Sequence, residues 1–137
     1  MSLPASSGVR FGRVLLLTRG AEGVSRAIAF YSKGLGIHLL RATDDWAELA
    51  CDNSSRDRIG GAFRLTIKAV ENEAQLCKGY SPVISFDVDD MDTVITRCIQ
   101  LGAYLDGPIQ YPAHGKVAVL RSPDGHMIGL YEPLLST

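Results

Sequence analysis

Several features that mark other protein classes are scarce in this sequence. It has one tryptophan, three cysteines and a formal net charge of −1 at pH 7. Since Lys and Arg do not outnumber Asp and Glu, the composition shows no basic footprint for nucleic acid and no polybasic patch for a membrane surface. The longest purely aliphatic run, residues 14–17, is far too short to cross a bilayer. We therefore expect neither nucleic acid nor a membrane as a partner.

The number and spacing of the cysteines indicate neither a zinc site nor a disulfide framework. Cys51, Cys77 and Cys98 are odd in number, widely spaced and fit no zinc signature, so we expect reduced thiols, mostly in the core of a cytoplasmic protein. The sequence contains no Ser-His-Asp order, phosphate-binding loop, dinucleotide fingerprint or C-x-x-C motif. Residues 1–9 lack the charged-then-apolar pattern of a secretory signal and are predicted to form a flexible tail.

The remaining residues, 10–135, are predicted to form a single α+β domain that repeats one pattern. Apolar runs predict strands at 10–18, 37–41, 46–51 and 62–70, and again at 83–88, 104–106, 116–120 and 127–132. Helical spacing marks residues 24–35 and 91–101, with a loop expected at 19–23 before the first helix. Each half, 10–70 and 81–135, thus runs strand, helix, strand, strand, strand.

Three stretches carry a family resemblance. They are A-I-A-F-Y-S-K-G-L-G at 27–36, F-D-V-D-D at 86–90 and S-P-D-G-H-M-I-G-L at 122–130. With the order of elements, they resemble the vicinal oxygen chelate superfamily, which includes glyoxalase I, extradiol dioxygenases, methylmalonyl-CoA epimerase and the fosfomycin- and bleomycin-resistance proteins. The resemblance implies two βαβββ units that pair into a curved mixed sheet around a central cleft, with the helices outside. It also implies a homodimer.

The resemblance further implies four positions for the ligands of a divalent metal, usually His, Glu or Gln. In this sequence they fall on Arg13, Arg64, Val83 and Gly129. None of these side chains ligates a cation in the usual way, because arginine is only a donor and the other two have no donor atom for a metal. We therefore expect no cofactor, and a divalent metal only if the site has been displaced.

Strand alternation selects candidates for a ligand site. Arg13, Arg64 and Ser85 should face the cleft, and the two arginines could bind a carboxylate, phosphate or enolate-like group. Alternatively, these arginines are paired with Asp87 or Glu48, or simply project into solvent. The other candidates are aromatic or titratable: Trp46, Tyr111 and Tyr131 as pocket lining (Trp46 could equally fill the core), Glu48, and His114 in a loop at the cleft mouth, where an ordinary loop histidine is the alternative. His126 is expected to be an exposed turn residue.

Three functions remain open at this stage. The first is a metal-free protein that binds a small, anionic or aromatic molecule, as the bleomycin-resistance proteins of the superfamily do. The second is a metal-dependent lyase or isomerase of the glyoxalase I or epimerase type with a displaced metal site, built with His114 and Glu48. The third is a non-catalytic subunit whose role is to interact with another protein.

Overall fold

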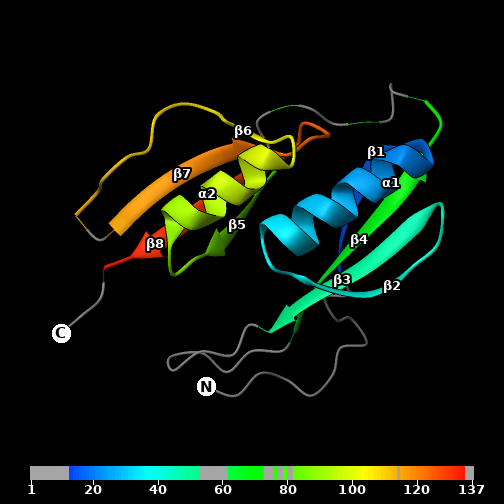
Figure 1. The fold of residues 1–137 in the computed structure, drawn as a ribbon, viewed down its shortest axis with the longest axis horizontal. Helices are drawn as coiled ribbons and strands as arrows, with labels where there is room; N and C mark the ends of the chain where they lie inside the picture. Colours follow the sequence, from blue (N-terminus) through cyan, green and yellow to red (C-terminus); the bar gives the residue numbers. More distant parts are fainter. Residues whose placement is uncertain are drawn as a thin grey trace, which may run out of the picture.

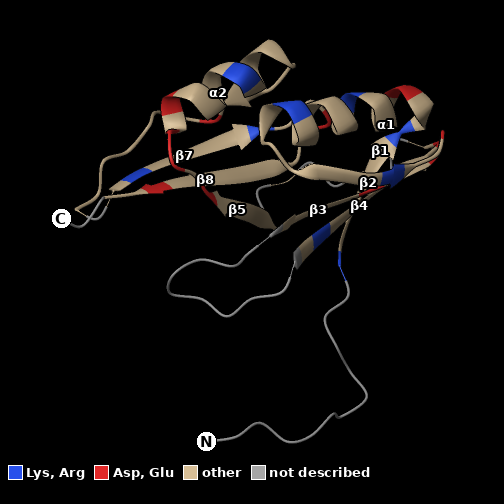
Figure 2. Ribbon diagram, turned by 60° about the horizontal axis from the view of Figure 1, so that its bottom comes forward, with Lys and Arg blue, Asp and Glu red and all other residues tan. Residues whose placement is uncertain are grey.

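The structure is a computed structural model that describes residues 13–52, 62–72, 76, 79, 82–113 and 115–134. Two four-stranded sheets lie next to each other, with the helices on one side of both (Figures 1 and 2). The first unit contains β1 (Val14–Arg19), α1 (Gly20–Ile28), the π-helical segment η1 (Ala29–Gly34), β2 (His38–Ala42), β3 (Trp46–Asp52) and β4 (Ala62–Val70). The second contains β5 (Val83–Asp87), α2 (Met91–Gln100), β6 (Tyr104–Leu105), β7 (Gly115–Arg121) and β8 (Met127–Pro133).

The two sheets have the same topology. Sheet 1 has the order β1-β4-β3-β2 and sheet 2 the order β5-β8-β7-β6. The first strand of each unit pairs in parallel with the last, and the remaining pairs are antiparallel. This repetition confirms the predicted α+β fold of two βαβββ units. Within the described residues, no helix is long and apolar enough to span a membrane.

Alternating burial explains why the helices cover only one face of each sheet. Leu16, Leu49, Leu65 and Ile67 of sheet 1 point toward the helices and are at most 8% exposed. Sheet 2 does the same with Leu120, Ile128 and Leu130, and α2 adds Met91, Val94, Ile95 and Cys98 to this core. Each large apolar side chain buried in this way contributes about 1.5–3 kcal/mol.

The start of the first helix differs from the sequence prediction. Residues 20–23, predicted as loop, form the first turn of α1. Gly20 adopts φ +66°, which lets the chain turn directly from β1 into the helix. Gly23 is buried against the side chain of Thr18, where a Cβ would clash. Two of the residues that suggested a loop are therefore glycines with a structural role in the first turn.

The end of the first helix widens into η1, which buries two consecutive aromatic rings. Phe30 and Tyr31 are at most 1% exposed and meet edge to face, with ring centroids 4.8 Å apart. Gly36, at φ +81°, follows and turns the chain toward β2. The second helix agrees with the prediction: Asp90 caps its N-terminus, and the hydrogen bonds from Thr93 hold the pKa of Asp90 below its usual value.

Contacts between the units run through the helices, through one turn and through two aromatic rings on β4 and β5. Arg97 Nε of α2 donates to the carbonyl oxygen of Gly34 at 3.2 Å. A Cβ on Gly34 would lie only 3.1 Å from Cys98 Sγ, so the glycine allows η1 and α2 to pack closely. The rings of Phe63 and Phe86 also meet, with their centroids 5.8 Å apart.

Burial raises the pKa of the Cys98 thiol to about 11, which fits a packing role better than a nucleophilic one.

We expect Gly23→Ala to destabilise the protein, because the added methyl group overlaps Thr18 Oγ1 and Thr18 is a fully buried, stiff β-branched residue. The cost should be about 1–3 kcal/mol in the free energy of unfolding, measured by urea denaturation. Ser25→Ala, at an exposed position of the same helix, is the matched control. Adding Thr18→Ala should recover most of the loss, and an equal loss in the double mutant would contradict the proposed clash.

A second prediction concerns Tyr31, whose hydroxyl has no hydrogen-bond partner within the described residues. Burial raises the pKa of this phenol well above its ordinary value, and the Asp124 carboxylate raises it further, while the nearby Ser122 hydroxyl acts weakly in the opposite direction. In the unfolded chain the phenol ionises near its ordinary pKa of about 10. Above that pH unfolding releases a proton, so stability falls as pH rises; below it, the group has no effect on pH dependence.

Tyr31→Phe should therefore reduce the loss of stability above about pH 10 by up to 1.4 kcal/mol per pH unit, measured by denaturation at several pH values. At neutral pH the variant should be at least as stable as the wild type, because it removes an unpaired buried hydroxyl. Tyr104→Phe, at a tyrosine that is 59% exposed, is the matched control and should leave the profile unchanged. Parallel profiles for wild type and Tyr31→Phe would contradict the assignment.

Candidate functional site

The candidate site lies on the faces of the two sheets opposite α1, η1 and α2, which we call the helix-free face. Burial alternates along the strands, so each side chain between two core residues points to this face. The predicted orientation of the first, fourth and fifth strands is confirmed. The residues on this face include Leu15, Leu17, Trp46, Glu48, Arg64, Thr66, Lys68, Ser85, Asp87, Gly129 and Tyr131.

Two arginines share one glutamate at the centre of sheet 1. Arg41 Nε lies 3.4 Å from Glu48 Oε2, and Arg64 Nη1 lies 3.4 Å from Glu48 Oε1. The Glu48 side chain is only 9% exposed, whereas those of Arg41 and Arg64 are 65% and 49% exposed. The alternative that Arg64 pairs with Glu48 is therefore what the structure shows. Two positive charges facing one negative charge still leave an excess positive charge at this position.

The neighbours of this cluster are fixed by strand register. Trp46, half-buried, lies two residues before Glu48 on β3 and pairs with Lys68 of β4. It therefore contributes to the helix-free face, and the alternative that it fills the core does not hold. Arg13 is exposed and directly precedes Val14, which pairs with Leu65, so its backbone lies level with Arg64. An aromatic ring and several cationic side chains thus share one side of sheet 1.

The corresponding part of sheet 2 is almost bare of charge. Ser85 pairs with Gly129, and Asp87 pairs with the half-buried Tyr131. A Cβ on Gly129 would lie 3.3 Å from both Ser85 Oγ and Val83 Cγ1. A glycine within a strand often marks a place where other atoms approach the backbone closely. At Gly129 these atoms belong to two side chains of the neighbouring strand β5.

The residues present do not fit a divalent metal at the four positions predicted from the resemblance. Arg13 and Arg64 offer only N–H donors, Val83 offers none, and Gly129 leaves little room for a side chain. Among the described residues, no group of three or more His, Cys, Asp or Glu side chains could hold a metal ion. The residues at these four positions therefore cannot support a metal-dependent step.

Other candidates lie elsewhere. Tyr111 is 71% exposed, and the bridge between Gln110 and Val117 places this segment beyond β7, at the edge of sheet 2 away from β5. His114 lies outside the described residues, as does Cys77. The prediction of a central cleft, like the ligand-binding roles of the candidates, stays a prediction.

Sequence reasoning missed Arg41 and misjudged His126. Arg41 could have been found from the β2–β3 hairpin, because its distance from the turn places it opposite Glu48. His126 was expected to be exposed, but it is half-buried and its Nε2 lies 2.9 Å from the carbonyl oxygen of Leu17. The turn packs against the first unit, so the histidine is drawn into the boundary between the units.

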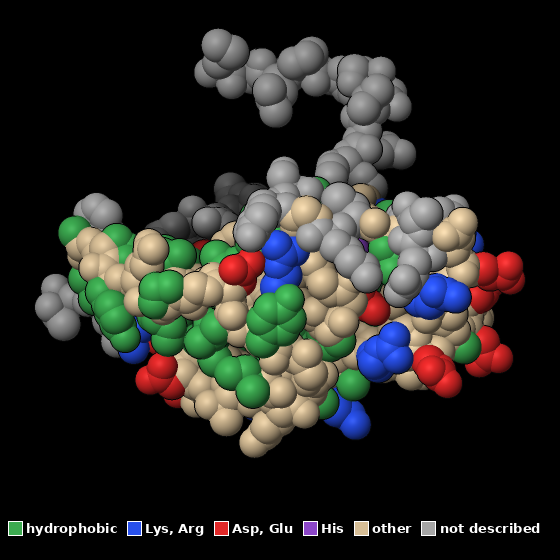
Figure 3. All heavy atoms as spheres, turned by 90° about the horizontal axis from the view of Figure 1, so that it is seen from above, with side chains coloured by type: hydrophobic (Ala, Val, Ile, Leu, Met, Phe, Trp, Pro, Cys, Tyr) green, Lys and Arg blue, Asp and Glu red, His purple; other side chains and the backbone are tan. Residues whose placement is uncertain are grey.

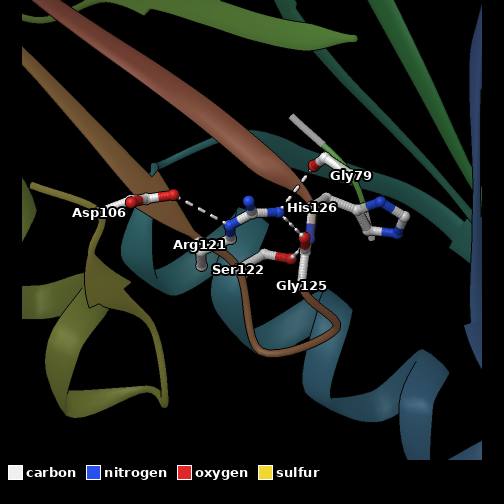
Figure 4. Close-up of polar contacts among 6 residues, drawn as sticks. All are labelled: Gly79, Asp106, Arg121, Ser122, Gly125 and His126. Carbon is white, nitrogen blue, oxygen red and sulfur yellow. Dashed lines mark hydrogen bonds and ion pairs between the residues drawn. The ribbon is translucent and has the colours of Figure 1, made fainter. Parts of the chain in front are cut away.

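The β7–β8 turn is held by a buried arginine that sequence analysis also overlooked. Arg121 is 8% exposed; its Nε lies 3.1 Å from Asp106 Oδ2, and its Nη1 donates to the carbonyl oxygens of Gly79 and Gly125, each at 2.8 Å (Figure 4). Ser122 Oγ also accepts a hydrogen bond from the backbone N–H of His126. The guanidinium thus joins three separate segments around one turn.

Comparisons with solved structures agree with this architecture. The fosfomycin resistance protein FosX from Mesorhizobium loti is 19% identical, with a TM-score of 0.64, over 92% of this chain and 93% of that one. FosX from Listeria monocytogenes, a complex with Mn(II) and sulfate, is 14% identical with a TM-score of 0.66, over 92% and 91% of the two chains. TnmS3, an antibiotic-binding protein from Streptomyces sp. CB03234, is 22% identical with a TM-score of 0.56, over 92% and 99%. At these identities the likeness establishes the fold alone.

A comparison with curated proteins finds no match. The sequence model of the glyoxalase-like domain family matches residues 16–131, which includes all of both units from β1 to β8 except their outermost residues. The paired βαβββ topology and the sequence match lead to the same assignment. This chain belongs to the glyoxalase-like domain family, and with it to the vicinal oxygen chelate superfamily.

Proposed function

We propose that this protein binds a small aromatic anion on the helix-free face of sheet 1, and that arginines supply the positive charge that a metal supplies elsewhere in the superfamily. The observation that carries the proposal is the sharing of Glu48 by Arg41 and Arg64. Each arginine places one guanidinium nitrogen near a different carboxylate oxygen. Since a guanidinium has five N–H donors, both retain donors for a further carboxylate or phosphate.

Glu48 has a positioning role in this proposal. Its side chain is nearly buried, while each arginine side chain is about half exposed or more. The glutamate therefore fixes one nitrogen atom of each guanidinium group and leaves the other N–H donors accessible. Preorganised donors bind an anion more strongly than flexible ones, because less side-chain entropy is lost on binding.

Trp46 is the reason for proposing that the ligand has an aromatic group. This ring lies on the same face as Glu48 and opposite Lys68. An aromatic side chain next to cationic groups suits a planar ligand that carries a negative charge, because the ring provides apolar area and the cations provide charge. That a protein of this fold, TnmS3, is described as antibiotic-binding supports a binding role.

Arg64→Gln should weaken binding of an aromatic carboxylate, such as benzoate or a larger analogue, by tenfold or more, which corresponds to about 1.4 kcal/mol. Isothermal titration calorimetry on a panel of aromatic and aliphatic carboxylates and phosphates measures this change. Lys33→Gln, at an exposed position of η1 on the opposite side of the molecule, is the control with the same change of charge. If no compound on the panel binds the wild type, the binding proposal fails. That result would favour the third function, a non-catalytic subunit that interacts with another protein.

Metal analysis separates this proposal from the competing function, a metal-dependent lyase or isomerase with a displaced site. The displaced site was predicted to use Glu48 and His114, of which His114 lies outside the described residues, and the Mn(II) complex of the Listeria relative favours this candidate. We expect purified protein to hold far less than one transition-metal ion per chain, and a chelator to leave ligand affinity unchanged. A stoichiometric metal whose removal abolishes binding would favour the enzyme.

A further inference from the structure

A cavity lies at the junction of the two units, away from the candidate site. Its volume is about 310 Å³, near the lower end for small-molecule pockets. The first unit contributes Arg19 and Arg26, and the second contributes Tyr104 and the turn at residues 122–125. None of the candidates on the helix-free face lines it. Figure 3 looks onto this end of the molecule, where hydrophobic side chains gather over the α2 half and charged ones of both signs over the α1 half.

The carboxylate of Asp124 is the unusual group in this cavity. Its side chain is 7% exposed, yet within the described residues it accepts no hydrogen bond. Its partner is Arg26, whose Nη2 lies 3.9 Å from Asp124 Oδ1, beyond hydrogen-bonding distance. Because Arg26 is too far away to donate a hydrogen bond to it, the carboxylate can accept hydrogen bonds from a ligand in the cavity that it lines. A ligand with N–H donors would satisfy it.

The opposite charge is supplied at the same cavity by two guanidinium groups. The Arg26 side chain is 50% exposed and therefore keeps donors available to solvent. Arg19 is exposed and precedes α1, whose N-terminus has no side-chain cap. The N-terminus of a helix adds to the positive potential near Arg19. The cavity thus presents a buried anion and two accessible cations.

Apolar surface completes the cavity. Tyr104 is 59% exposed and lines it together with Pro123 and Leu76. These side chains offer a ring and aliphatic area to a ligand of matching character.

We propose that this cavity binds a small zwitterion, an α-amino acid with an apolar side chain, whose ammonium group contacts Asp124 and whose carboxylate contacts Arg19 and Arg26. The ligand would satisfy the Asp124 carboxylate and use the free donors of both arginines. It would touch both units at once and stabilise their junction. Because it binds only the folded chain, it should raise the unfolding temperature in a concentration-dependent way.

The experiment titrates the protein with L-leucine and L-phenylalanine by calorimetry and follows thermal unfolding. Two blocked compounds test the two halves of the recognition: N-acetyl-leucine lacks the ammonium group, and leucine amide lacks the carboxylate. Each should bind at least tenfold more weakly than leucine, or about 1.4 kcal/mol. If N-acetyl-leucine bound as tightly as leucine, the cavity would be a plain anion site, and the zwitterion proposal would be overturned. Failure of both amino acids to bind would overturn it as well.

Variants assign the binding to this cavity. Asp124→Asn keeps the shape of the side chain and a residue that turns accept, and it should weaken leucine binding by at least tenfold. Asp44→Asn, an exposed aspartate in the β2–β3 turn, is the matched control. Arg19→Gln is a second test, at an exposed position at the end of β1. If both cavity variants fold and bind leucine like the wild type, the site lies elsewhere; Arg64→Gln should not affect leucine binding.

Discussion

One-sided burial of the two sheets is the constraint on which the rest of this structure depends. The helices cover a single face, so the central strands place their large apolar side chains on that face and most of their charged ones on the other. A shift of one residue in β3 would turn Trp46 and Glu48 toward the helices and turn Ala47 and Leu49, which are fully buried, away from them. Hydrophobic burial therefore sets the positions of the charged residues as firmly as any contact between the charges themselves.

The arrangement on the helix-free face differs physically from a metal centre. A divalent cation concentrates charge at one point and needs anionic or neutral ligands around it. Arg41 and Arg64 spread charge over two planar groups, and Glu48 offsets part of it. Such a surface recognises the shape and planarity of an anion, but it polarises a bound oxygen less than a metal does. This difference is the reason for proposing a binding role at this face.

Much of this architecture could be predicted from local sequence signals. Alternating apolar residues located the strands, and the apolar stripe with Asp90 located α2. The start of α1 could not be predicted in the same way, because Gly20 and Gly23 favour loops locally, and the close packing of Gly23 against Thr18 becomes apparent only in the fold. The π-helical segment η1, which buries Phe30 and Tyr31, was likewise not predicted from the sequence.

The candidate site was predictable only in part, since side-chain pairing depends on register across strands. Alternation along β4 gave the direction of Arg64, but its partner Glu48 lies on another strand and was one of several possibilities. Arg41 and Arg121 were missed, because an isolated arginine carries no local signal of burial or pairing. The predicted homodimer and cytoplasmic location stay predictions, because a single chain holds no information about a second copy or a compartment.

The contacts of Arg97, His126 and Arg121 have a consequence for how the repeated halves relate. Each of these side chains reaches a backbone carbonyl outside its own unit: Gly34, Leu17 and Gly79 respectively. A fragment containing the second unit alone would leave Arg97 and His126 without their acceptors in the first unit and would remove the η1 side of the η1–α2 contact. The duplication visible in the topology therefore does not make the two units structurally independent, because side chains of the second unit are fixed to the backbone of the first.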